Sequence, residues 1–132
     1  MNKPVKFELA KLLKEKGFDG NTYYSPIVCS LLYYKLDSSL TTSTHFYETQ
    51  ERVKAPTIAE VIMWLYEKHG IWIANNWQSG SKTFLYELID LNSYENTILI
   101  QEKNYKDVGE VEFKTPSEAY EAAIEYTLNN LI

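Results

Sequence analysis

The chain has 132 residues, of which 45% are hydrophobic and 23% charged, and its formal net charge is −5. This length suits one domain with a core large enough to fold without disulfides, and the composition excludes a disordered chain. The acidic balance and the single arginine, Arg52, argue against nucleic-acid binding, because duplex binding requires a patch of lysine and arginine.

The compartment is indicated by what the chain lacks. Cys29 is the single cysteine, so no intrachain disulfide can form, which favours a reducing compartment. The stretch "MNKPVKFELAKLLKEKGFD" alternates lysine with apolar residues and has no apolar run of signal-peptide length. No stretch approaches the ~20 apolar residues of a membrane span. We therefore expect a soluble, cytoplasmic protein without membrane contact.

Apolar residues at helical spacing predict a first helix from about Val5 to Lys16. Its inward face consists of Val5, Leu9, Leu12 and Leu13. Gly17 suits a left-handed position just beyond the helix, and Phe18 can then contact Leu13 in a Schellman motif. A helix end at Gly17 is therefore expected.

The segment from Asn21 to Lys54 has two interpretations. Its tyrosine, valine and threonine favour strands in "TYY" and "VCSLLYYKL", whereas Ser25-Pro26 could instead begin a helix through Tyr34. "DSSLTTSTH" is expected to form a polar loop or hairpin tip, and "HFYETQ" a further short strand. The strand interpretation is the favoured one.

The stretch "PTIAEVIMWLYEKHGIWI" predicts a second helix that ends at Gly70 and continues into a strand. Thr57 and Glu60 have the spacing of a capping box at its start. A narrow apolar stripe is formed by Ile58, Val61, Ile62 and Leu65. Glu60 and Glu67 are expected on the opposite, solvent-exposed face.

Three further side chains of this helix lie off the apolar stripe. They are Met63, Trp64 and Tyr66. We expect them to close the margins of the core rather than to form a ligand site.

A strand-rich region follows. "IWIANNW" and "KTFLYELIDL" are separated by "QSGS", which predicts a hairpin in which Gly80 provides a positive φ. "TILIQEK" and a short "EVEF" strand would extend the hairpin into an antiparallel meander of three or four strands.

The last helix has the clearest start signal, in "TPSEAYEAAIEYTLNNLI". Thr115 is predicted as N-cap, Pro116 as N1 and Glu118 as N3. The inward face is predicted as Tyr120, Ala123, Ile124, Leu128 and Leu131, and the solvent face as Glu118, Glu121 and Glu125. The order is then α-β-β-α-β-β-β-α, a single α+β domain over residues 1–132.

No motif for catalysis, a metal or a cofactor is present. His45, His69 and Cys29 have no metal-ligand spacing, and there is no nucleophile elbow or phosphate-binding loop. His69 suits the end of a helix, where a cation complements the helix dipole, and Cys29 suits an apolar core. A protein without enzymatic activity, metal or cofactor is therefore favoured.

Tyrosine is the feature that stands out, with 11 residues. Tyrosine and tryptophan provide apolar area with a polar tip and are enriched at binding surfaces. The candidate binding residues are Tyr24, Tyr33, Trp72 and Trp77, which could form a pocket that stacks a base. The alternative is that these rings edge a small sheet.

Three stretches resemble a family. "LAKLLKEKGFD", "APTIAEVIMWLYEKHGIWI" and "TPSEAYEAAIEYTLNNLI" are together similar to small uncharacterised proteins of gut Bacteroidales and their phages or prophages. The resemblance covers the three helices in the same order but not the region from Tyr23 to Lys54. It implies an origin in a mobile element and an intracellular site of action, and it brings no activity or site residue.

Two functions follow as hypotheses. The first is a non-enzymatic module that binds a host protein or itself, as a phage accessory protein would. The second is a protein that binds or sequesters a small, nucleotide-type ligand, against which stands the shortage of arginines to hold phosphates.

Self-association is the more specific form of the first hypothesis. "CSLLYYKL" is apolar and has only Lys35 as a charge, so an open edge there would be adhesive and could form a symmetric homodimer. The alternative is that "DSSLTTSTH" folds back and covers this edge.

Overall fold

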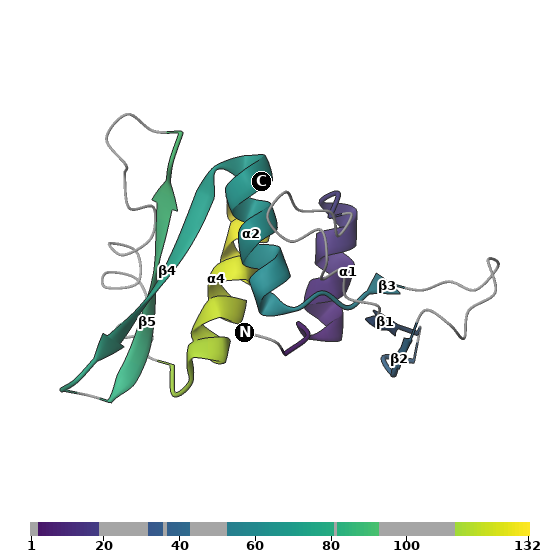
Figure 1. Ribbon diagram of the computed structural model, residues 1–132, viewed down its shortest axis with the longest axis horizontal. Coiled ribbons are helices and arrows are strands. Elements are labelled where there is room, and N and C mark those ends of the chain that lie inside the picture. The colour runs from purple at the N-terminus through teal and green to yellow at the C-terminus, as the bar shows by residue number, and fades with distance from the viewer. Residues whose placement is uncertain (1–2, 19–31, 36, 43–52, 81, 93–112) are drawn as a thin grey trace.

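The computed structural model describes residues 3–18, 32–35, 37–42, 53–80, 82–92 and 113–132. These residues form three helices and two antiparallel sheets, so the predicted α+β class is confirmed. The elements in chain order are α1 (Phe7–Glu15), β1 (Leu32–Tyr34), β2 (Leu40–Thr42), β3 (Val53–Lys54), α2 (Ile58–His69), β4 (Ile71–Gln78), β5 (Thr83–Asp90) and α4 (Pro116–Asn130). The helices stand between the β4–β5 hairpin on one side and the small β1–β2–β3 sheet on the other (Figure 1).

Helix α1 ends as its glycine predicts. Gly17 has a φ of 90°, the Phe18 N–H donates to the Leu13 carbonyl (3.0 Å), and the Gly17 N–H donates to the Lys14 carbonyl (3.2 Å). These two bonds are those of a Schellman motif. They turn Phe18 back onto the core, where its ring packs edge-on against Trp64.

Helix α2 has both predicted ends. The Thr57 side chain accepts from the Glu60 N–H, and the Glu60 carboxylate accepts from the Thr57 N–H, which completes the capping box. Gly70 ends the helix with a φ of 64°. The expectation that Glu60 faces solvent is wrong: its side chain turns back to the cap and the residue is buried.

The three side chains off the α2 stripe have different environments. Trp64 is part of the core itself, with only 3% of its surface exposed. Met63 is half-buried, as a margin residue would be. Tyr66 is exposed and contacts the Trp72 ring edge-on, with centroids 5.8 Å apart.

Strands β4 and β5 form the predicted hairpin, in continuous register from Ile71↔Asp90 to Gln78↔Thr83. The prediction that Gly80 provides the positive φ is wrong. Among the described residues of the turn, Lys82 is left-handed, with a φ of 56°, and its N–H donates to the Gln78 carbonyl (2.9 Å).

The predicted "EVEF" strand is described only at its last residue. Phe113 forms an antiparallel bridge with Phe84, with backbone bonds of 2.8 and 3.0 Å. This bridge adds a third backbone segment at the outer edge of β5. "TILIQEK" lies outside the described residues.

Strand β1 is the central strand of the sheet order β2-β1-β3. It pairs with β2 from Leu32↔Thr42 to Tyr34↔Leu40 and with β3 at Tyr33↔Lys54 and Tyr34↔Val53. The open edge expected in "CSLLYYKL" is therefore absent over Leu32–Tyr34, because β2, part of "DSSLTTSTH", folds back onto it. A helix through Tyr34 is likewise wrong, while Ser25, Pro26 and "HFYETQ" lie outside the described residues.

Helix α4 begins as predicted. Pro116 is its first residue, and the Thr115 side chain accepts from the Glu118 N–H (3.2 Å). The predicted inward residues Ala123, Ile124 and Leu128 are fully buried.

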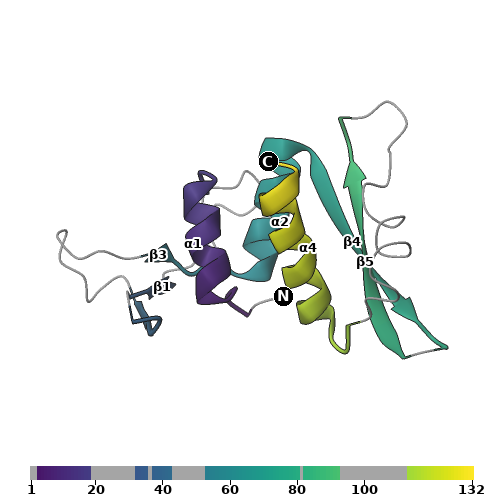
Figure 2. The same cartoon turned by 180° about the vertical axis from the view of Figure 1, so that it is seen from behind.

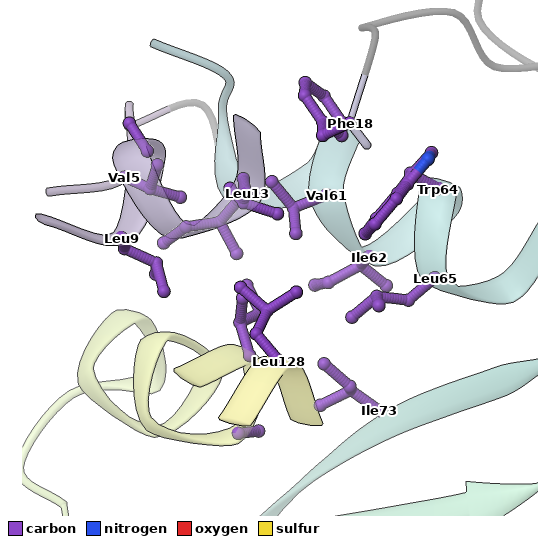
Figure 3. Packing of buried hydrophobic residues seen from close by; sticks show 14 of the residues in the cluster. Val5, Leu9, Leu13, Phe18, Val61, Ile62, Trp64, Leu65, Ile73 and Leu128 are labelled. Carbon is purple, nitrogen blue, oxygen red and sulfur yellow. The ribbon is translucent and has the colours of Figure 1, made fainter. Parts of the chain in front are cut away.

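One core joins the helices to the β4–β5 hairpin. Leu13 of α1, Val61 and Leu65 of α2, Leu128 of α4 and Ile73 of β4 converge in it (Figure 3). Among the described residues, no helix is long and apolar enough to cross a membrane.

Candidate functional site

The aromatic residues predicted to bind a ligand do not come together. Tyr33 lies on β1 and the two tryptophans on β4, on opposite sides of the helices (Figure 1). Trp72 and Trp77 are five residues apart on a regular strand, so their side chains point to opposite faces. Tyr24 lies outside the described residues. A shared pocket is therefore not formed by Tyr33, Trp72 and Trp77.

The two tryptophans instead belong to separate aromatic pairs. Trp72 is 38% exposed and packs against Tyr66 of α2. Trp77 is 54% exposed and packs against Phe84 across the hairpin, with ring centroids 5.0 Å apart. Both pairs leave aromatic surface in contact with solvent, from Tyr66, Trp72 and Trp77.

His69, at the end of α2, packs against a residue of the core. Its ring packs edge-on against Trp64, with centroids 4.8 Å apart, and burial lowers its pKa below the ordinary value. Burial thus disfavours the cation that would complement the helix dipole. Among the described residues, no group of three histidines, cysteines or carboxylates could hold a metal. Cys29 and His45 lie outside these residues.

A groove of about 410 Å³ is lined by residues of α1 and α4. The two helices contact each other, and Figure 2 shows their arrangement. The apolar lining of the groove consists of Leu9, Leu12, Phe113 and Ala122. Its charged lining consists of Lys6, Glu8, Glu118, Glu121 and Glu125. We call this site the α1–α4 groove.

Both groove walls follow from helical spacing. On α4, Glu118, Ala122 and Glu125 are separated by four and three residues, so they line one stripe of the helix. On α1, Leu9 is buried, whereas Leu12 is only half-buried. Leu12 therefore belongs both to the edge of the core and to the floor of the groove.

Glu121 lies at the boundary between the groove and the core. The prediction that it faces solvent is wrong, because its side chain is only 9% exposed. Its carboxylate lies 3.8 Å from the Lys3 ammonium and 4.0 Å from the Lys6 ammonium. These partners come from the opposite end of the chain, so the periodicity of α4 alone could not indicate them.

Backbone hydrogen bonds hold the two lysines near Glu121. The Val5 N–H donates to the Pro56 carbonyl (2.9 Å), and the Ile58 N–H donates to the Lys3 carbonyl (3.1 Å). The N-terminal segment is thereby fixed beside the start of α2.

Tyr34 adds a third tie, since its hydroxyl donates to the Val5 carbonyl. Burial and the charge of Glu121 raise the pKa of Tyr34 above its ordinary value, so it stays a neutral donor near pH 7.

The other carboxylates of the groove have fewer partners. Glu8 lies 3.7 Å from the Lys11 ammonium at the surface. Glu118 and Glu125 form no ion pair with any other residue that the structure describes. These two carboxylates stand two helical turns apart, a rise of about 10.5 Å along α4. The groove therefore has an excess of negative charge along its α4 wall.

This lining is suited to binding. Apolar side chains on two packed helices can desolvate a ligand, and the carboxylates attract a cation and repel a phosphate. The lining residues that the structure describes include no serine, cysteine or histidine that could act as a nucleophile or as its base. A nucleotide is disfavoured here by charge.

No family model, curated protein or solved structure matches this chain. The resemblance to small Bacteroidales and phage proteins accordingly stays a prediction.

Sequence reasoning missed the groove because its two walls lie more than 100 positions apart in the chain. The available signals were weak: Ala122, a small residue between two acids, and Leu12, at the edge of the α1 stripe. Both are equally compatible with ordinary helix surfaces.

Proposed function

We propose that this chain is a non-enzymatic protein-interaction module and that the α1–α4 groove receives a segment of its partner. The observation that carries this proposal is the groove itself, which combines an apolar floor with a charged rim on two packed helices. Protein interfaces have the same arrangement, with an apolar centre that excludes water and a polar periphery.

The apolar surface extends beyond the groove towards the hairpin. Phe113 lines one end of the groove and pairs with Phe84, which in turn packs against the exposed Trp77. Residues directly opposite in an antiparallel bridge share a face, so Phe113, Phe84 and Trp77 lie on one face of the sheet. This extension matters because a stable interface needs about 800 Å² from each partner, more than a groove of this size offers.

A phage or prophage accessory role is part of the same proposal. It rests on the resemblance of the three helix stretches alone, which would place the partner in a bacterial host.

The alternative function, a binder of small ligands, is favoured by one observation. The groove volume of about 410 Å³ falls within the ~300–1,000 Å³ of typical small-molecule sites. Its carboxylates favour a small cation over a nucleotide.

The proposal can be tested by selecting ligands from a random peptide display library, with counter-selection against a filled groove. Ala122→Trp places an indole in the groove, and Ala59→Trp is the matched control, because Ala59 is a half-buried alanine of α2 that does not line the groove. Circular dichroism first confirms that both variants fold.

We expect peptides that bind the wild type and Ala59→Trp but not Ala122→Trp. Selected peptides that bind all three proteins equally would place the interaction elsewhere and overturn the proposal. Turnover in a hydrolase and nucleotidase screen that Glu118→Gln abolishes would also overturn it.

A further inference from the structure

The carboxylates of the α1–α4 groove differ in whether lysines neutralise them. Glu121 is compensated by Lys3 and Lys6, which approach it to 3.8 and 4.0 Å. Glu118 and Glu125 have no such compensation among the described residues. The side of the groove that is open to a partner therefore carries two carboxylates whose natural complement is a pair of cations.

The spacing of these two carboxylates favours a helical partner over an extended strand. Seven residues of α-helix rise about 10.5 Å and return to almost the same angle, so Glu118 and Glu125 lie in one row. A partner helix with basic residues one heptad apart repeats this distance. A partner strand presents side chains on one face every ~6.6 Å, which does not match the row.

The apolar lining selects the same kind of partner. Leu9 and Leu12 on α1 face Ala122 on α4 across the groove, and Ala122 lies between the two carboxylates. Because alanine is small, a side chain of the partner can pack beside Ala122 and contact Leu9 and Leu12. A helix with an apolar stripe flanked by basic residues fills such a groove and pairs with its rim.

We infer that the partner segment is an amphipathic helix whose apolar stripe occupies the α1–α4 groove, and that Glu118 and Glu125 bind basic residues one heptad apart on it. This inference rests on the proposed function and names the chemistry of the partner. A second copy of the chain does not supply the helix from its described elements, because α1, α2 and α4 all contribute their apolar faces to the same core.

The inference can be tested with two model peptides of about 18 residues. Both carry leucine at the a and d positions of the heptad, and their flanking e and g positions are all lysine in one and all glutamate in the other. Binding to the full chain is measured by isothermal titration calorimetry at low and at high salt. The lysine peptide is expected to bind and the glutamate peptide is not.

The double variant Glu118→Gln/Glu125→Gln tests the two named carboxylates. Two exposed ion pairs are expected to be worth about tenfold in affinity, and added salt should weaken binding to the wild type more than to this variant. The matched control is Glu15→Gln/Glu67→Gln, which removes two helix carboxylates outside the groove lining. It should change the affinity by less than about twofold.

Two results would overturn the inference. If both double variants weaken binding equally, the peptide responds only to net charge. If spermine binds as tightly as the lysine peptide and displaces it, the site accepts a polycation rather than a helix.

The proposed function and the inference fail in distinguishable ways. Display selection can give peptides whose binding Ala122→Trp abolishes. If these peptides are neutral or acidic, or if Glu118→Gln/Glu125→Gln does not change their affinity, the inference fails and the proposed function stands. If Ala122→Trp weakens the binding of no selected peptide, whatever its charge, both the proposed function and the inference fail.

Discussion

Gly17 and Gly70 both end a helix in the left-handed conformation, with φ of 90° and 64°, but their surroundings differ. A Cβ at Gly17 would meet no atom within 4 Å, whereas one at Gly70 would lie 2.4 Å from the Asn92 amide nitrogen. That amide donates to the His69 carbonyl at the end of α2 (2.9 Å). Gly70 thus combines a conformational requirement with a close approach.

These environments predict graded losses of stability on substitution by alanine. Gly17→Ala should lower the free energy of unfolding by about 1–2 kcal/mol, the cost of a left-handed alanine. Gly70→Ala should cost about 1 kcal/mol more, because Asn92 must also move. Gly80→Ala is the control, since Gly80 has no positive φ and no atom near its Cβ position. Equal losses at Gly17 and Gly70 in urea unfolding would contradict the role of Asn92.

His69 should make the stability depend on pH. Burial lowers its pKa in the folded state below the ordinary 6.5. The unfolded chain therefore binds the proton more readily, and stability rises with pH through this window. On acidification below about pH 6.5 the free energy of unfolding should fall more steeply for the wild type than for His69→Gln. Parallel urea midpoints for the two proteins between pH 7.5 and 5.5 would exclude this contribution.

Expectations for the glycines at the helix ends are correct because their cause is local, whereas the expectation for Glu121 is wrong because its partners are distant. Gly17 and Gly70 were identified because a helix end restricts its own backbone. Glu121 was misplaced because Lys3 and Lys6 reach it from the other end of the chain. Hydrophobic periodicity describes the faces of one helix and does not indicate which residues of a distant segment contact it.

Helix boundaries were predictable for the same reason, since a cap lies within four residues of the amides it satisfies. At α2 the Thr57 hydroxyl and the Glu60 carboxylate satisfy each other's amides. Thr57→Ala should therefore lower the free energy of unfolding by about 1 kcal/mol. Thr57→Ser keeps the hydroxyl and should stay within a few tenths of a kcal/mol of the wild type. A serine variant as unstable as the alanine variant would mean that the lost methyl group, not the cap, is responsible.

The position of β1 was not predictable, because strand order depends on contacts between distant segments. The sequence indicated a strand and offered its cover by "DSSLTTSTH", which contains β2, as an alternative, but it did not indicate that β3 would pair with the other edge. Because β2 and β3 pair with β1, the structure does not support a dimer through an open β1 edge. Self-association stays a prediction without an assigned surface.

Tyr34 fastens the β1–β2–β3 sheet to the helices, since its hydroxyl bonds the Val5 carbonyl and its ring contacts Phe7 edge-on. Tyr34→Phe should lower the free energy of unfolding by about 1 kcal/mol, the net value of a typical hydrogen bond. Tyr120→Phe is the control, a half-buried tyrosine of α4 without a hydrogen bond among the described residues. If chemical denaturation shows equal losses for the two variants, the Tyr34 bond contributes nothing specific.

The fold class follows from the pattern of elements, whereas the candidate site follows from how they pack. Three helices and a hairpin are legible because each satisfies its own periodicity and turn chemistry. The α1–α4 groove requires two helices from opposite ends of the chain to lie together, with Leu12 and Ala122 left partly uncovered. Aromatic content pointed instead to Tyr33, Trp72 and Trp77, which the fold separates.

The shared core predicts that the helices and the hairpin unfold together. Leu128 is fully buried where α1, α2, α4 and β4 meet (Figure 3), so Leu128→Ala should cost about 2–5 kcal/mol through lost contacts and the cavity left behind. Because the core is common, far-UV circular dichroism and tryptophan fluorescence should report one transition in the wild type and in this variant. Leu40→Ala, at a leucine of β2 that is 47% exposed, is the control and should change stability little. Two separate transitions would show instead that the hairpin, with Trp72 and Trp77, unfolds independently of the helices around Trp64.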